Sequence, residues 1–196
     1  MVAAVQNEQR INRVNYNRYR LGMWVLLAAV VMLFTSLTSA YIVRAASAND
    51  WQSLPMPRIL IVSTALILIS SVTFETARRK LKYSLRRDYL RWLLLTAALG
   101  VAFLVTQLAA WRQLVRQGVH LATHPHGAFF YLLAATHGVH LLGGLLVVMY
   151  LIVRSRRSEN DQTQAKTLAA IDAATLYWHF MDGLWIYLFV LLFYWR

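Results

Sequence analysis

The segment from Ala128 to Val153 contains no aspartate, glutamate, lysine or arginine. About 20 mainly apolar residues in an α-helix cross a bilayer core about 30 Å thick, so this segment is long enough to span a membrane. Four other segments are also mainly apolar and of similar length. We therefore predict an all-α integral membrane bundle, a single domain over residues 1–196, with five transmembrane helices at roughly residues 21–43, 59–77, 90–110, 129–153 and 174–194.

Composition supports a membrane protein and excludes several kinds of site. Of the 196 residues, 59% are hydrophobic and only 14% are charged, which is outside the usual range of soluble domains. The chain has no cysteine. Disulfides, iron–sulfur ligation, covalent haem attachment and thiolate zinc sites are therefore excluded.

The net charge of +12 is concentrated between the apolar segments, which indicates membrane topology and not nucleic-acid binding. Fifteen lysines and arginines fall in residues 10–20, 78–91 and 154–166, on one side of the predicted bundle. The other side carries five: Arg44, Arg58, Arg112, Arg116 and Arg196. The positive-inside rule then places the N-terminus in the cytoplasm and the C-terminus outside. The first apolar segment is too long for a cleaved signal, so we expect it to be retained as a span.

Four ionisable residues form a predicted intramembrane polar cluster: His137, His140, His179 and Asp182. Such groups are costly in hydrocarbon and need a protein partner or water. Within each pair the spacing is i, i+3, so both side chains share one face of their helix. His140 and Asp182 fall at nearly the same depth when about 1.5 Å is counted per residue. We therefore expect a hydrogen bond between these two residues, joining the fourth and fifth helices.

A haem bound by one histidine from each helix is an alternative for this cluster. The bulky residues Trp178, Phe180 and Trp185 on the fifth helix disfavour it. A small transporter with the cluster as its polar pocket is another alternative. Three further histidines, in the outer segment HLATHPHG, could bind a metal but have no carboxylate or thiolate beside them: His120, His124 and His126. No arrangement typical of a catalytic site is present, and we predict no catalytic, cofactor or metal residue.

Glu75 precedes Arg78 and Arg79 by three and four residues, which favours a local ion pair. Arg78, Arg79 and Lys80 lie at the predicted cytoplasmic end of their helix, at headgroup level. They are possible contacts for anionic phospholipid, although cytoplasmic basic residues are also expected from topology alone.

Two long motifs resemble a known family. HGAFFYLLAATHGVHLLGG, residues 126–144, and LYWHFMDGLWIYLFVLLFYW, residues 176–195, resemble the histidine-rich helix and the closing helix of subunit III of the haem–copper terminal oxidases. RLGMWVLL at 20–27 and SSVTF at 70–74 are similar to two earlier helices of that family. The resemblance covers residues 20–196 in order.

The resemblance implies a subunit without haem or copper, those cofactors being held in partner subunits. It implies packing against oxidase subunit I and contact with other oxidase subunits. It also implies stable proton uptake and turnover, structural phospholipid, and a place in the bacterial cell membrane. A nitric oxide reductase accessory protein of the same family and a membrane b-type cytochrome remain alternatives.

The sequence also departs from the family pattern. Five helices replace the usual seven, as in short bacterial forms, with the first two missing. The family's buried glutamate corresponds to Val30, so its role is not carried over. His-Gly-Val-His and Asp-Gly-Leu-Trp replace the commoner His-Gly-Leu-His and Asp-Val-Val-Trp.

Overall fold

In the computed structural model the described residues are all except 1, 48–56, 84, 120–124, 158–160 and 195–196. These residues form five α-helices and no strand, and all five helices are long and apolar enough to cross a membrane. The all-α prediction is confirmed. The helices are α1 (Val2–Ser47), α2 (Ile59–Lys82), α3 (Arg86–Arg116), α4 (Pro125–Arg157) and α5 (Asp161–Tyr194).

Every helix is longer than the apolar segment that predicts it. The largest differences are in α1, which begins at Val2, and in α5, which begins at Asp161. Hydrophobicity marks only the part of a helix that lies in lipid, whereas the backbone hydrogen bonds within a helix can continue into water.

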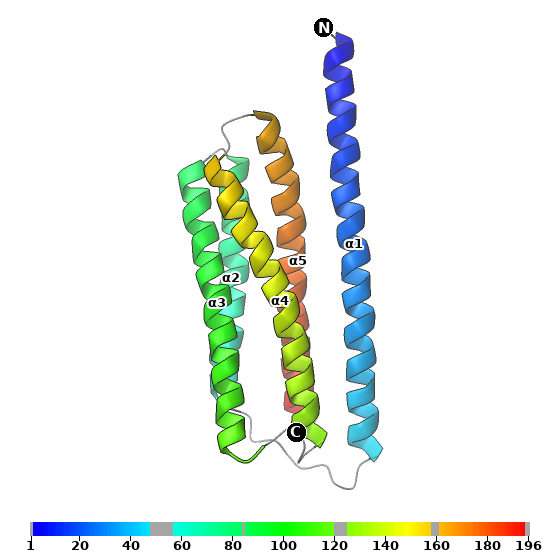
Figure 1. Ribbon diagram of the computed structural model, residues 1–196, viewed down its shortest axis with the longest axis vertical. Coiled ribbons are helices and arrows are strands. Elements are labelled where there is room, and N and C mark those ends of the chain that lie inside the picture. Colours follow the sequence, from blue (N-terminus) through cyan, green and yellow to red (C-terminus); the bar gives the residue numbers. More distant parts are fainter. Residues whose placement is uncertain (1, 48–56, 84, 120–124, 158–160, 195–196) are drawn as a thin grey trace.

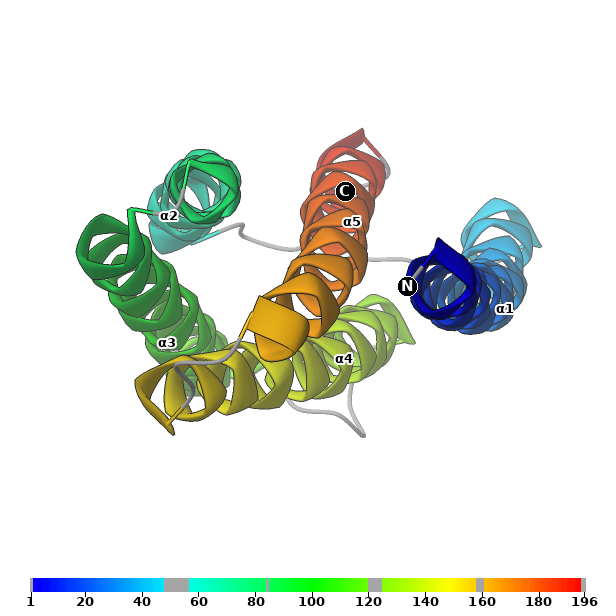
Figure 2. The same ribbon diagram turned by 90° about the horizontal axis from the view of Figure 1, so that it is seen from above.

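Helices α2, α3, α4 and α5 form a closed ring in which each helix contacts both of its neighbours. Helix α1 lies outside this ring and packs only against α4 and α5 in the described part of the chain (Figure 2). The helices run nearly side by side, and α1 extends well beyond the others at its N-terminal end (Figure 1). The molecule is therefore a four-helix bundle with one peripheral helix.

The side chain of Trp178 fills the centre of the ring. It is 1% exposed and makes an edge-to-face contact with Phe74. Its Nε1–H donates a 3.0 Å hydrogen bond to Oγ of Ser70. A Cβ atom added at Gly100 would lie 3.0 Å from Cη2 of Trp178. A Cβ atom added at Gly144 would lie 3.0 Å from Cε1 of Tyr177. The two glycines thus leave the space that the aromatic side chains of α5 occupy.

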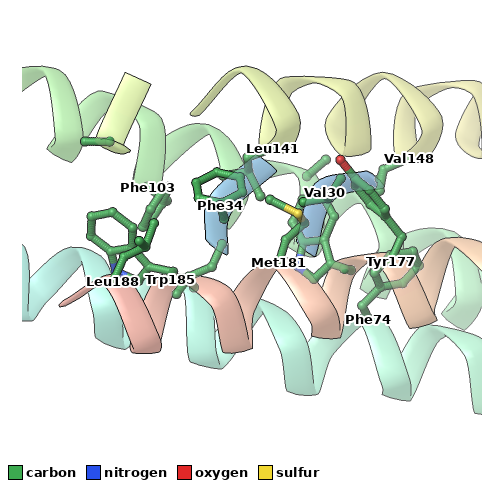
Figure 3. Close-up of a cluster of buried hydrophobic side chains, with 14 of the residues drawn as sticks. Val30, Phe34, Phe74, Phe103, Leu141, Val148, Tyr177, Met181, Trp185 and Leu188 are labelled. Atoms are coloured by element: carbon green, nitrogen blue, oxygen red, sulfur yellow. The ribbon is translucent and has the colours of Figure 1, made fainter. Parts of the chain in front are cut away.

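Trp185, about two turns further along α5, makes a similar set of contacts. Its Nε1–H donates a 3.0 Å hydrogen bond to Oγ1 of Thr64, and its ring meets Phe103 edge-to-face. Figure 3 shows Trp185 close to Phe103 within the buried cluster, which also includes Val30 and Phe34 of α1. Burying an indole with its N–H bonded avoids the cost of an unpaired polar group in an apolar interior.

Short hydroxyl and amide contacts join α2 to α3. The hydroxyls of Thr73 and Thr96 are 2.8 Å apart, and Nε2 of Gln107 donates to Oγ of Ser63 at 3.1 Å. Many side chains on the outer faces are apolar, with Leu146 71% exposed and Val139 65% exposed. These hydroxyl and amide groups of α2 and α3 thus lie between helices, while the large apolar outer surface suits lipid or another membrane protein.

We predict that Gly144→Ala destabilises the bundle by about 1–3 kcal/mol, because the new methyl group would press on the rings of Tyr177 and Trp178. Gly143→Ala is the control, since no atom lies within 4 Å of its added Cβ. Unfolding of each variant in mixed micelles, followed by intrinsic tryptophan fluorescence, measures the difference. Equal stability of the two variants would contradict this account of the packing.

Candidate functional site within the membrane

His137 is fully buried in an aromatic environment. Its ring centroid lies 5.9 Å from that of Phe103 and 5.2 Å from that of Trp185. Among the described residues, neither ring nitrogen has a hydrogen-bond partner. The described contacts of this imidazole are therefore packing contacts with rings of α3 and α5.

His140 bonds to its own helix. Its Nδ1 lies 2.8 Å from the carbonyl oxygen of Thr136, one turn earlier. A carbonyl oxygen can only accept, so Nδ1 carries a proton and donates it in this contact. The ring also packs edge-to-face against Phe34 of α1, and the carbonyl of His140 accepts a 2.8 Å bond from the hydroxyl of Tyr177.

The predicted hydrogen bond between Asp182 and His140 is wrong for this structure. Asp182 is 3% exposed, and neither of its carboxyl oxygens has a hydrogen bond of ordinary geometry to the part of the chain that the structure describes. It shares a face of α5 with Trp178 and Trp185, whose N–H groups bond to α2, whereas His140 contacts α1. The depth count placed the two residues at the same height but could not give their direction around each helix.

Asp182 has a hydroxyl of α2 close to it. Ser71 is near enough for an electrostatic interaction with the carboxyl group. The bonded partner of Ser71 is His179, whose Nδ1 lies 2.5 Å from the serine Oγ. Nε2 of His179 is 4.0 Å from Oε2 of Glu75, further along α2. Glu75, His179, Ser71 and Asp182 thus form a row of polar groups between α2 and α5.

Glu75 makes both ion pairs that its spacing favours. Its carboxylate is 3.1 Å from Nη1 of Arg78 and 3.0 Å from Nε of Arg79. Arg78 also donates from Nε to Asp172 of α5 at 2.5 Å, and Nζ of Lys82 lies 3.9 Å from the same carboxylate. The bond to Asp172 makes Arg78 part of the α2–α5 interface.

Sequence reasoning missed Ser71 and Asp172. Ser71 is four residues before Glu75, on the same face of α2, and this spacing is the signal that could have identified it. Asp172 fell just outside the predicted fifth helix, which began at residue 174. The structure extends α5 back to Asp161 and so brings Asp172 onto the helix that faces α2.

The outer histidines are only partly described. His126 is buried, and its Nε2 lies 3.2 Å from the hydroxyl of Tyr41 on α1. His120 and His124 lie outside the described residues. Among the residues that the structure describes, no three histidines or carboxylates lie close enough together to hold a metal ion.

The hollows of the surface lie apart from most of these residues. A groove of about 750 Å³ runs between α3 and α4, and none of the four predicted cluster residues lines it. His140 lines a smaller hollow of about 330 Å³, with residues of α1 and α5. Of the four predicted cluster residues, His140 alone therefore lines either of these two hollows.

Comparison with known proteins identifies relatives over nearly the whole chain. Residues 9–196 match the family described as "Cytochrome c oxidase subunit III". The chain is 30% identical to "Probable cytochrome c oxidase subunit 3" of Nocardia farcinica, over 96% of this chain and 94% of that protein. It is 28% identical to "Quinol oxidase subunit 3" of Bacillus spizizenii, over 95% and 90% of the two chains. With "Cytochrome c oxidase subunit 3" of Bacillus sp. PS3 it is 30% identical, over 88% and 84%.

We predict that Ser71→Ala and His179→Ala are coupled by about 0.5–1.5 kcal/mol in a double-mutant cycle, because each removes the same hydrogen bond. His140→Ala with Asp182→Ala is the matched cycle. It should be additive to within about 0.5 kcal/mol, because no hydrogen bond joins these residues in the described part of the chain. Unfolding free energies in mixed micelles provide both cycles. Strong coupling in the second cycle would show that His140 and Asp182 interact and would contradict the structure.

Proposed function

Because the chain belongs to the cytochrome c oxidase subunit III family, we propose that it is a non-catalytic, stabilising subunit of a proton-pumping haem–copper oxygen reductase. As an oxidase subunit III it is a component of a multisubunit oxidase complex, and its five apolar helices make it a multi-pass membrane protein. The proposal concerns what the subunit does within that complex.

The observation that supports a non-catalytic role is the use of the polar side chains. Ser71 bonds His179 across α2 and α5, Arg78 bonds Asp172 across the same two helices, and His140 bonds its own helix. These groups stabilise the bundle through contacts between and within helices. Haem and copper would then be held by partner subunits, and this chain would bind neither.

Oxidase subunit I is the proposed main partner, with other oxidase subunits around it. The outer faces of the bundle are strongly apolar at lipid depth, which suits packing on another membrane protein. The electron donor, cytochrome c or quinol, is not assigned, since relatives of both kinds match the chain.

Structural phospholipid is the proposed small-molecule partner. Of the three basic residues expected at the headgroups, Arg78 is engaged by Glu75 and Asp172. Arg79 pairs with Glu75 but its side chain is 71% exposed, so it can also reach lipid. Lys80 is half-buried at the same end of α2. We propose that these contacts are secondary to the packing role.

Removal of this subunit tests the function. Purified in mild detergent, the intact complex should contain this chain together with haem and copper. The isolated chain should show no Soret band and no copper by elemental analysis. A complex lacking the subunit should begin oxygen reduction near the normal rate and then lose activity during turnover, because the redox centres would lie elsewhere. A stoichiometric Soret band in the isolated chain, or an immediate loss of electron transfer to oxygen, would refute the proposal.

The orientation is tested separately. In the bacterial cell membrane, residues 155–166 should face the cytoplasm and Arg196 the outside, because fifteen basic residues fall on the first side and five on the second. The chain has no cysteine, so single cysteines introduced at Ser158, within this polar segment, and at Arg196 can be labelled in intact cells without background. An impermeant reagent should label only the second position. Labelling of the first from outside would reverse the topology.

A further inference from the structure

We propose that the groove between α3 and α4 is a binding site for one anionic phospholipid, with its phosphate on Arg112 and Arg116 and an acyl chain between the two helices. This site lies at the C-terminal end of α3 and is distinct from the basic residues Arg78, Arg79 and Lys80 at the C-terminal end of α2. The orientation proposed above would place it in the external leaflet of the membrane, and no other part of the proposal rests on that orientation.

The groove has an apolar lining and a charged mouth. Its volume is about 750 Å³, which is within the range of about 300–1,000 Å³ typical of ligand sites. The lining residues of α3 are Leu108, Trp111, Arg112, Val115 and Arg116, and those of α4 are Ala128, Tyr131, Leu132 and Ala135. Only the two arginines among them are charged. The groove therefore matches a molecule with one anionic end and a long apolar part.

The walls of the groove are held in place by specific contacts. The rings of Trp111 and Tyr131 meet edge-to-face with centroids 5.7 Å apart, across α3 and α4. The hydroxyl of Tyr131 donates a 3.0 Å hydrogen bond to the carbonyl of Val119, just beyond the end of α3. Tyr131 is itself buried. The groove is thus built into the helix pair before any ligand binds, which reduces the ordering that binding requires.

The two arginines present a matched pair of cations. They are separated by four residues, so their side chains project from the same face of α3. Both are exposed, and no ion pair involves either of them in the part of the chain that the structure describes. Guanidinium groups bind phosphate oxygens through paired hydrogen bonds. A lipid phosphate would supply the negative charge that the protein does not.

The dimensions fit a lipid lying along the bilayer normal. Arg116 is the last residue of α3, and Leu108 is two turns deeper. At about 1.5 Å per residue, the groove extends roughly 12 Å from the charged mouth into the hydrocarbon. The arginines are then at headgroup level, and Leu108 and Ala135 lie beside the upper part of an acyl chain.

The opposite end of α3 supplies a contrast. Arg87 and Arg91 are also four residues apart and exposed, but Nη1 of Arg91 lies 3.7 Å from Asp88. They fall on the side where the positive-inside rule already accounts for basic residues, whereas Arg112 and Arg116 fall on the side with few of them. A specific ligand gives a reason for two cations at that end.

Lipid titration of the purified full-length protein in detergent, read by native mass spectrometry, tests the proposal. Phosphatidylglycerol and phosphatidylcholine are the probes. Wild-type protein should bind one phosphatidylglycerol more tightly than phosphatidylcholine. The double variant Arg112→Gln with Arg116→Gln should weaken phosphatidylglycerol binding by about 25-fold, which corresponds to about 1 kcal/mol for each cation. Arg87→Gln with Arg91→Gln, which removes the same charge from the same helix, should leave this binding unchanged.

A second pair of variants tests the acyl-chain part of the site while keeping both charges. Leu132→Trp should fill the groove and lower the stoichiometry from one bound phosphatidylglycerol to none. Leu132 is 46% exposed, so the larger side chain does not enter the core. Leu142→Trp is the control, on an exposed position of α4 outside the groove. Each variant is first compared with wild type by tryptophan fluorescence unfolding.

The outcomes distinguish a specific lipid site from non-specific attraction of anionic lipid to basic residues. They also test the site independently of the proposed role in an oxidase. Equal weakening by both arginine double variants would show general attraction of anionic lipid and would overturn the site. Equal binding of both lipids, or unchanged binding in Leu132→Trp, would also overturn it. Binding is measured on this chain alone, so its loss or retention does not depend on assembly with an oxidase core.

Discussion

The burial of Trp178 within the ring of four helices is the contact on which much of the structure depends. Its indole occupies space that exists because residues 100 and 144, on α3 and α4, lack side chains. Its N–H is satisfied by a serine of α2. One residue of α5 therefore determines the approach of three other helices, and a larger residue at either glycine would require α5 to move outward.

The direction of α5 also determines the polar row beside it. With Trp178 and Trp185 directed to the ring centre and to α2, His179 is carried to the edge of the α2–α5 interface, where it meets Ser71. Asp172, less than two turns before Trp178, faces the C-terminal end of α2 and accepts a hydrogen bond from Arg78. The polar contacts thus follow from aromatic packing, since hydrogen bonds in membranes contribute only about 0.6 kcal/mol each on average.

The sequence predicted well what depends on position along a helix. The five spans follow from the length of the apolar segments, and the pairs of Glu75 follow from i, i+3 and i, i+4 spacing. Val30, which the resemblance aligns with a glutamate of the family, is 2% exposed in an apolar cluster with Met181 and Leu141 (Figure 3). What could not be predicted is the rotation of each helix about its own axis. That rotation separates His140 from Asp182, and it is set by the packing of large rings into gaps on other helices.

The peripheral position of α1 has a consequence for the order in which the protein is made. Among the five described helices α1 is synthesised first, yet its described contacts are with α4 and α5 alone. Roughly 120 residues separate the end of its span at Ser47 from the start of the last span at Thr167, which corresponds to about 6–24 s of synthesis at 5–20 residues per second. Helices α2 and α3 can pair with each other during this interval, because they are consecutive and in contact. Of the five helices, α1 therefore waits longest for its neighbours, and before α4 is made its sides are covered by lipid, the insertion machinery or another protein.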